Sequence, residues 1–352
     1  GSACCGGECV QFPHARRWSI DVLTGWYPAF KYRRALSPEE LQCELPQIET
    51  GTLTPDDSLG LVRFNSTFME FVDRTFKIKG MAATLCAMVV SSINIFGLSA
   101  LVVKAHGMSG GLMQEAIPVG IVALAVFGAQ ALIWTVHFRC DVFQYTHYPV
   151  RFNRVTRRIY FFRHNGPDGV VVVPWGSPYA FFHIGRGGQD PSLRDLRCHL
   201  LDRHRQVQQT FTIGHFWNHD DDIREQWALI CRYMKDGPEH CFDDPLDRVI
   251  TLSPKGTLRN CWMLVCLMMG TTLFPLRYTL MFPIYGALTL SRWLTFKTCR
   301  APVFPPELEA ECAIAPDDPY ALPEPRFMAE FASDPAIYAR ALQRHRERML
   351  WR

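Results

Sequence analysis

The sequence predicts a membrane protein of mixed class, with two transmembrane helical hairpins on either side of a cytosolic α+β domain. Three observations lead to this prediction. Residues 80–138 hold two long uncharged runs, and residues 257–297 hold a further apolar region. The stretch between them holds β-branched and aromatic runs separated by turn residues and ends in an amphipathic helix. Long apolar runs are typical of membrane helices, and short β-branched or aromatic runs bounded by turn residues are typical of strands.

The first hairpin, residues 80–138, is predicted from its two runs, residues 80–103 and 116–138, which contain no Asp, Glu, Lys or Arg. A helix needs about 20 apolar residues to cross the roughly 30 Å of hydrocarbon in a bilayer. The alternative is a buried hairpin in a large soluble core. A soluble helix of this length normally carries a polar stripe, and neither run has one. We therefore expect a turn outside the membrane between the runs and a cytosolic N-terminal segment at residues 1–79.

The positive charges indicate the orientation of this hairpin. Lysine and arginine are enriched in the cytoplasmic loops next to membrane helices. Lys79 precedes the first run, Arg139 follows the second, and the joint between them carries only Lys104, which Glu115 offsets. The joint is therefore expected outside the cell, and the N- and C-termini are expected in the cytoplasm.

Arg277 divides the second apolar region, residues 257–297, into two uncharged halves. An arginine at the centre of a bilayer costs several kcal/mol, so a single span through this residue is disfavoured. We expect a second hairpin with Arg277 at its outer tip, where Pro275 and Pro283 would bend the helices. Because both halves are short for a membrane span, a re-entrant or interfacial element is the alternative.

Residues 139–256 are predicted to form the cytosolic α+β domain. β-branched and aromatic runs between turn residues predict strands. These runs lie within residues 148–163, 170–175, 178–185 and 206–217. A helix follows over residues 219–240, with aspartates at its start, Trp227 on its apolar face and Gly-Pro at its end. Several antiparallel strands followed by one amphipathic helix favour a pleckstrin-homology-like (PH-like) barrel or open sheet.

Residues 298–352 are predicted to form a cytosolic proline-rich, acidic connector and an arginine-rich amphipathic helix at residues 327–352. The prolines predict little regular structure in the connector. Two interpretations of the helix stay open. It lies on the anionic inner leaflet of the membrane, or it packs on the sheet domain.

The composition excludes several classes of function. The net charge is +3, and the basic residues are not gathered in one segment, so no nucleic-acid partner is expected. The apolar runs of the first hairpin hold no charged side chain, whereas a proton-coupled carrier or ion pump usually needs one. Several of the thirteen cysteines lie inside apolar runs, which indicates thiols in a reducing compartment rather than disulfides.

The N-terminal segment lacks the apolar core of a signal peptide. Its cysteines, Cys4, Cys5 and Cys9, would suit a metal site or an acylation site. No Cys/His pair with zinc-finger spacing follows them, so metal binding there is not favoured. No cofactor is predicted.

The best candidate metal site in the sequence is HFWNHDDD, in which His215, His219 and Asp220 lie close together. On a helix the two histidines would share a face, and imidazole beside carboxylate can hold a divalent ion. Helix capping is the preferred interpretation, because the aspartates stand where a helix begins and its dipole attracts negative charge.

Four arginines, Arg151, Arg154, Arg157 and Arg158, follow the second run closely and are expected just inside the membrane. They are candidates for binding acidic lipid headgroups, with the lipid bilayer as partner. Ordinary positive charge that sets the topology is the simpler interpretation of the same residues.

Two patterns carry a resemblance to a known family, EQWALICRYMKDGP at residues 225–238 and PVFPPELEAECAIAPDDPY at residues 302–320. YPVRFNRVTRRIYFF and the tryptophan of VVVVPWGS extend the resemblance over residues 60–325. The chain resembles a poorly characterised family of proteobacterial multi-pass membrane proteins that are encoded beside type VI secretion effectors. That family has no established active residues, so the resemblance implies a setting and no catalytic site.

The resemblance implies bacterial competition and an inner-membrane location. We expect a multi-pass immunity protein, not an enzyme, that binds and neutralises a cognate effector protein and that could form a homo-oligomer. The alternative is a membrane-anchored adaptor or loading factor for effector secretion. A membrane enzyme that acts on lipid, centred on His215, His219 and the adjacent aspartates, is a third hypothesis.

Overall fold

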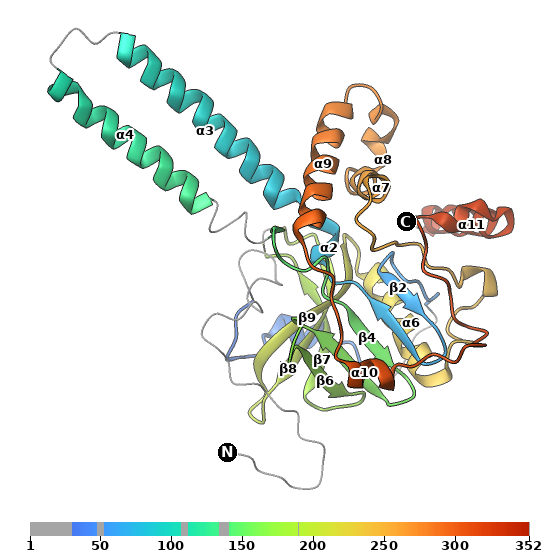
Figure 1. Cartoon of the computed structure of the whole chain (residues 1–352). Coiled ribbons are helices and arrows are strands. Elements are labelled where there is room, and N and C mark those ends of the chain that lie inside the picture. The colour runs from blue at the N-terminus through green and yellow to red at the C-terminus, as the bar shows by residue number, and fades with distance from the viewer. Residues whose placement is uncertain (1–29, 48–52, 107–111, 134–140, 189, 352) are drawn as a thin grey trace. The chain divides into compact units, whose positions relative to one another are not determined.

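The chain divides into two compact units in the computed structural model, which describes residues 30–47, 53–106, 112–133, 141–188 and 190–351 (Figure 1). The first unit combines residues 1–77, 147–255 and 301–352, and the second combines residues 78–146 and 256–300. Among the described residues, the first unit holds both sheets, and the second consists of helices and their connections.

A five-stranded antiparallel sheet forms one half of the first unit. Its strands, in spatial order, are β2 (Leu61–Phe64), β3 (Phe68–Phe71), β4 (Val150–Asn153), β5 (Arg158–Phe162) and β6 (Val170–Pro174). β3 and β4 are neighbours, with Phe71 opposite Val150, although residues 78–146 separate them in the chain. Their aromatic and β-branched side chains pack well on a pleated surface.

A four-stranded antiparallel sheet forms the other half. Its strands, in spatial order, are β1 (Arg34–Ala35), β9 (Gln206–Trp217), β8 (Arg194–Leu201) and β7 (Ala180–Arg186). The short helix α1 (Pro38–Gln42) follows β1, and the backbone after it runs along β7. There the N–H of Leu45 donates to the carbonyl of Phe182, and the N–H of Ile184 donates to the carbonyl of Cys43. This backbone therefore covers the outer edge of β7, which protects the edge from pairing with another chain.

The two sheets and helix α6 (Asp220–Asp236) share one hydrophobic core. Trp227 and Tyr233 of α6 bury their rings in this core and still satisfy their polar atoms. Trp227 Nε1 donates to the carbonyl of Pro46 at 2.7 Å, and the Tyr233 hydroxyl donates to the carbonyl of Asn65 at 2.7 Å. Large aromatic side chains buried in this way stabilise the packing of α6.

The prediction of a sheet domain is confirmed, but its described strands form two antiparallel sheets and not the PH-like barrel or single open sheet that was expected. β4, β5, β6, β7, β9 and α6 lie in the stretches where strands and a helix were predicted. Gly237 ends α6 with a φ of 90°, a conformation that glycine adopts without strain. Strands β1, β2, β3 and β8 were not predicted, and three of them lie before residue 139.

Asp195 of β8 is a buried carboxylate in contact with two arginines. Arg74 Nη1 contacts its Oδ2, and Arg197 Nε donates to its Oδ1 at 2.6 Å. Burial opposes the ionisation of Asp195, but the two guanidinium groups outweigh burial and lower the pKa of the carboxyl. Since Arg74 follows β3 and Asp195 belongs to β8, the ion pair joins the two sheets.

Helices form the second unit. They are α3 (Met81–His106), α4 (Leu112–Ile133), α7 (Leu258–Met268), α8 (Gly270–Leu273), the 3-10 turn η4 (Phe274–Leu276) and α9 (Phe282–Thr298), and α2 (Thr75–Ile78) precedes α3. Figure 1 shows α3 beside α4, and Gln130 Nε2 donates to Asn94 Oδ1 between them. Asp141 fixes the start of α3, because its Oδ2 accepts from the N–H groups of Gly80 and Ala83 at 3.1 Å. Such N–H groups have no partner within the helix itself.

The predicted fold class is wrong in its membrane part. Two transmembrane hairpins were expected, whereas among the described residues one helical stretch, Thr75–Gly97, is long and apolar enough to cross a membrane. The apolar stretches Gly120–Leu132 and Leu258–Met268 are shorter. The protein is α+β with two antiparallel sheets and one possible membrane-spanning helix, so a multi-pass location in the inner membrane is not supported.

Packing within the protein explains the error in the second apolar region. α7 has 11 residues and α9 has 17, both shorter than the roughly 20 residues that a membrane span needs. Arg292 of α9 is buried and donates through Nη1 to the carbonyl of Lys79 at 2.8 Å. Tyr285 of α9 lies buried in one cluster with Val265 of α7. An uncharged stretch of sequence does not reveal that its apolar side chains pack against one another.

The C-terminal helix α11 (Pro335–Trp351) packs on the first unit, after the short helices α10 (Pro306–Glu311) and η5 (Glu330–Ser333). Arg340 Nη2 contacts Asp247 Oδ2 at 2.9 Å, in the 3-10 turn η3 (Pro245–Asp247). Arg344 forms an ion pair with Asp56. Of the two interpretations that the sequence left open, these contacts support packing on the sheet domain.

Replacing Asp195 tests the ion pairs that join the sheets. Asp195→Asn removes the carboxylate that Arg74 and Arg197 contact, and losing one partner of a buried ion pair typically costs about 3–5 kcal/mol. We expect the free energy of unfolding of the detergent-solubilised chain, from urea titration by tryptophan fluorescence, to fall by about that amount. Asp190→Asn is the matched control, because Asp190 is exposed, and it should change the value by less than about 0.5 kcal/mol. Equal losses in the two variants would contradict this role.

The buried thiols of the first unit should be unreactive in the folded protein. Burial raises the pKa of the Cys241 thiol to about 12, and it raises the pKa of the Cys198 thiol well above its ordinary value. The thiolate is the reactive form, so both residues should stay unmodified by iodoacetamide at neutral pH. Mass spectrometry of tryptic peptides should show labelling of both only after denaturation. Rapid labelling of either one in the native protein would show that it is not buried.

Candidate functional site

Two histidines lie on adjacent strands of the four-stranded sheet and point to the same face. His183 of β7 is opposite Arg197 of β8, and His199 follows Arg197 by two residues on the same strand. Successive side chains of a strand alternate between the two faces. Phe182, Ile184 and Cys198 therefore belong to the hydrophobic core, whereas His183 and His199 lie on the opposite face.

Helix α1 and the strand before it cover this second face. Both imidazoles are almost completely buried, with 1% and 0% of their surface exposed. Leu36 packs against Phe181, Leu201 and Val207 in a small hydrophobic cluster on the same side. The first turn of α1 then places Glu40 over His199.

A capping box orients the Glu40 side chain. The Glu40 N–H donates to Ser37 Oγ at 3.2 Å, and the Ser37 N–H donates to Glu40 Oε2 at 2.8 Å. Pro38 occupies the first turn, where its missing N–H costs nothing. Arg34 of β1 then holds the carboxylate at two points, from Nη1 to Oε2 at 2.7 Å and from Nη2 to Oε1 at 2.5 Å.

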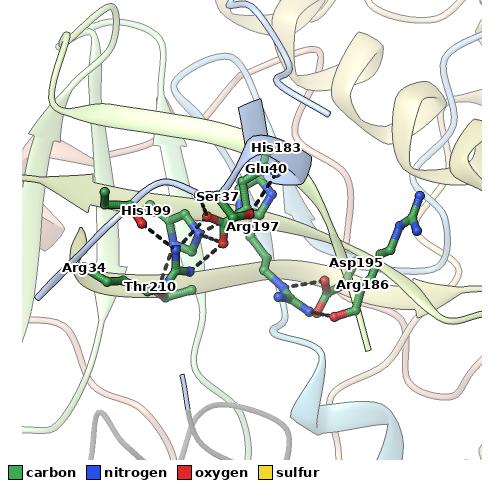
Figure 2. Close-up of polar contacts among 10 residues, drawn as sticks. Arg34, Ser37, Glu40, His183, Arg186, Asp195, Arg197, His199 and Thr210 are labelled. Carbon is green, nitrogen blue, oxygen red and sulfur yellow. Dashed lines mark hydrogen bonds and ion pairs between the residues drawn. The ribbon is translucent and has the colours of Figure 1, made fainter. Parts of the chain in front are cut away.

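The three side chains converge on one point (Figure 2). His183 Nε2 lies 2.9 Å from His199 Nε2, which lies 3.1 Å from Glu40 Oε1. His199 Nδ1 lies 2.8 Å from Thr210 Oγ1 of β9. Glu40, His183 and His199, here called the Glu40 cluster, are the group among the described residues whose side chains could hold a metal ion, because their potential ligand atoms lie within 4.8 Å of one another.

Burial and neighbouring charges determine the protonation of the cluster. Burial lowers the pKa of His183 to about 3, with a further contribution from His199. Burial also lowers the pKa of His199, although Glu40 opposes this. Burial alone would raise the pKa of Glu40, but hydrogen bonds from His199 and Arg34 outweigh it and lower the pKa. At neutral pH the cluster therefore combines two neutral imidazoles with an ionised carboxylate.

A comparison with models of known protein families identifies the family of this chain. Residues 129–316, more than half of the chain, match the model of a family of unknown function (DUF6708). The chain belongs to the DUF6708 family. No curated protein and no solved structure matches it.

The DUF6708 match includes His183 and His199 but not Glu40 or Arg34. It confirms that the chain belongs to a poorly characterised family, as the resemblance implied. The description of DUF6708 names no group of organisms and no secretion system, so those parts of the resemblance stay predictions.

The residues of the predicted metal site occupy separate positions in the DUF6708 chain. His215 is buried in β9, with its ring 6.0 Å from that of Phe76. His219 is the N-cap residue of α6. Asp220 lies in the first turn of α6 with the next two aspartates, and its carboxylate accepts from Arg194 Nε at 2.7 Å. Within the described part of the chain, the metal-compatible group does not include these three residues.

The four arginines predicted at the membrane contact groups of their own domain. Arg151 is buried between Glu70 and Glu309. Arg154 and Arg157 donate to the carbonyls of Ser66 and Met234, and Arg158 contacts Glu311. Their binding of lipid headgroups stays a prediction, and the buried position of Arg151 gives it a structural role as well.

The four residues predicted to mark the topology have different surroundings. Lys79 is buried in the second unit, and Arg277 lies in the turn before α9, over the ring of Phe274 at 3.7 Å. Lys104 belongs to α3, and Arg139 lies outside the described residues, as do Cys4, Cys5 and Cys9.

Sequence reasoning missed the Glu40 cluster because two of its elements were not recognised. The strand RDLRCHLL and the helix start SPEE both carry usable signals. The first alternates polar and apolar residues, and the second has the spacing of a capping box. Their meeting in space has no local signal, because Glu40 and His199 are 159 residues apart.

Replacing Glu40 tests the importance of the cluster for stability. Glu40→Gln keeps the shape of the side chain but removes the charge that Arg34 and His199 contact, and hydrogen bonds to charged groups contribute about 1.5–3 kcal/mol. We expect the free energy of unfolding, measured with EDTA present, to fall within that range. The neighbouring Glu39→Gln alters an exposed residue and should leave the free energy of unfolding unchanged. A Glu40→Gln protein as stable as the control would show that the cluster contributes little.

Proposed function

We propose that the protein is a membrane-anchored immunity protein whose sheet domain binds and neutralises a cognate effector toxin. The setting, type VI secretion between bacteria, comes from the sequence resemblance. The mode of action, direct binding, is supported by the surface of the domain. Anchoring in the inner membrane through the single candidate span, Thr75–Gly97, is part of the same proposal.

The proposal rests on one observation, that α11 has one face in contact with the domain and one face exposed to solvent. Arg340 and Arg344 lie one turn apart and are held by aspartates of the domain. Tyr338 and Leu342, also one turn apart, are exposed at 47% and 38%. Residues three or four apart share a helix face, whereas residues two apart do not. The outward face of α11 therefore presents an apolar pair to solvent.

The chemistry of this outward face favours a protein partner. Arg346 follows Leu342 by one turn and is exposed too. Tyrosine and arginine are enriched among the residues that carry most of the binding energy at protein interfaces. Tyr338, Leu342 and Arg346 together suit a partner with an apolar depression and an acidic rim. Binding to an anionic membrane would instead use Arg340 and Arg344, which already contact aspartates.

Co-expression with the effector encoded beside this gene tests the proposal. The full-length chain should restore growth of cells that make the effector, and the two proteins should co-purify. Tyr338→Ala combined with Leu342→Ala should weaken binding about tenfold or more, because each anchor residue contributes more than about 1 kcal/mol. Val155→Ala is the matched control, since Val155 is an exposed apolar residue of the β4–β5 turn, and it should bind normally.

Two outcomes would argue against an immunity protein. If the effector kills cells that make the full-length chain and the proteins do not co-purify, the proposal is wrong. If cells without the gene remain healthy but no longer secrete the effector, the adaptor or loading factor is the correct function.

A further inference from the structure

The hydrogens of the Glu40 cluster cannot be placed so that every buried polar atom is satisfied. Glu40 is ionised and only accepts hydrogen bonds, so His199 Nε2, 3.1 Å from Oε1, must carry a proton to be attracted to it. His183 Nε2 then faces a protonated nitrogen at 2.9 Å and can only accept. The proton of neutral His183 must therefore sit on Nδ1, which is buried and has no hydrogen-bond partner among the residues that the structure describes.

The other arrangements of the hydrogens bring like groups of the three side chains into unfavourable contact. If His183 Nε2 carries the proton and donates it to His199, the lone pair of His199 Nε2 points at a carboxylate oxygen. If both Nε2 atoms are protonated, two N–H groups face each other across 2.9 Å. A charged imidazolium is disfavoured because both rings are almost completely buried. A buried polar group without a partner costs about 1–3 kcal/mol, so each arrangement carries a penalty.

A cation relieves the contacts among the three converging atoms, because His183 Nε2, His199 Nε2 and the Glu40 oxygen can then all act as electron-pair donors, while His183 Nδ1 keeps its proton. Two imidazole nitrogens and one carboxylate oxygen are a donor set that binds Zn²⁺ in proteins, with a fourth position left for water or another ligand. We propose that Glu40, His183 and His199 bind one divalent cation of the zinc class through His183 Nε2, His199 Nε2 and a Glu40 carboxylate oxygen.

The surroundings of the cluster fit such a site. Ligand histidines usually use their second nitrogen as a donor to an oxygen, and Thr210 Oγ1 lies 2.8 Å from His199 Nδ1. Arg34 orients the carboxylate in the same manner. Zn–N bonds of about 2.0–2.1 Å in a tetrahedral arrangement would place the two nitrogens about 3.4 Å apart. The histidine side chains therefore need to separate by about half an ångström from the 2.9 Å observed.

The expected consequence of binding is structural. Glu40 belongs to α1, whereas His183 and His199 belong to β7 and β8. A cation held by all three fastens the segment around α1 to the outer face of the sheet, where Arg34 and Leu36 also pack. This role is independent of the toxin-binding surface proposed on α11.

Metal titration of the full-length, detergent-solubilised chain tests the site. The background variant carries Cys4→Ser, Cys5→Ser and Cys9→Ser, so that thiolates near the N-terminus do not bind the probe. After EDTA treatment and dialysis, Zn²⁺ affinity is measured by competition with a chromogenic chelator. Co²⁺ absorption then reports the ligand type, because thiolate ligands add charge-transfer bands that imidazole and carboxylate do not.

We expect the background protein to bind one equivalent of Zn²⁺ and to give a Co²⁺ spectrum without thiolate bands. Binding should also raise the melting temperature. Glu40→Gln should weaken Zn²⁺ binding at least tenfold, whereas Glu39→Gln and His219→Gln should not. Circular dichroism confirms that each variant is folded, and Glu40→Gln keeps the test valid if a variant of His183 fails to fold. The proposal is overturned if the background protein binds no Zn²⁺, or if Glu40→Gln binds it as tightly as Glu39→Gln.

Discussion

The sheet domain depends on the burial of polar side chains on the outer face of β8, each of which must contact a partner from another element. Asp195, Arg197 and His199 are every second residue of β8 and therefore lie on this face. Asp195 and His199 are almost completely buried. Buried polar groups without partners destabilise a fold. The partners are Arg74 after β3, which contacts Asp195, and Glu40 of α1, which contacts His199 and is held in turn by Arg34 of β1. The residues from 30 to 47 are therefore an integral part of the domain, because they cover and neutralise this face.

Glu40 is the residue that links these contacts. Its carboxylate completes the capping box of α1, accepts from Arg34 and lies beside His199. A single carboxylate thus fixes a helix start, a short edge strand and a buried imidazole. The same convergence creates the excess of electron-pair donors that favours a cation, so the stability of the domain and its metal site have one origin.

The sequence predicted the part of the fold that local patterns determine. The β-branched and aromatic runs of β4, β5 and β6 and the capped, amphipathic α6 are visible in the chain itself. The pairing of β3 with β4 is not, because residues 78–146 separate the strands and no local signal joins them. The candidate site was missed for the same reason. The metal site predicted at His215, His219 and Asp220 relied on proximity in the sequence, but the end of β9 and the start of α6 give these residues different surroundings.

The membrane prediction failed where a low density of charge was equated with contact with lipid. In α7 and α9 the apolar side chains pack against each other, and the buried Arg292 has the carbonyl of Lys79 as its partner. Length and composition describe a helix, but they do not say which surface covers it. Thr75–Gly97 is the candidate span among the described residues by its length and composition alone.

A double-mutant cycle between Glu40 and His199 tests most directly whether the Glu40 carboxylate holds the residues from 30 to 47 on the sheet. The free energies of unfolding of Glu40→Gln, His199→Gln and the double variant are compared with that of the unmodified chain, with EDTA present. Residues in direct contact within one hydrogen-bond network show coupling energies of about 0.5–3 kcal/mol. We expect a coupling energy in this range for Glu40 with His199, and a value near zero for the exposed Glu39 with His199. A coupling energy near zero for both pairs would contradict the role of Glu40.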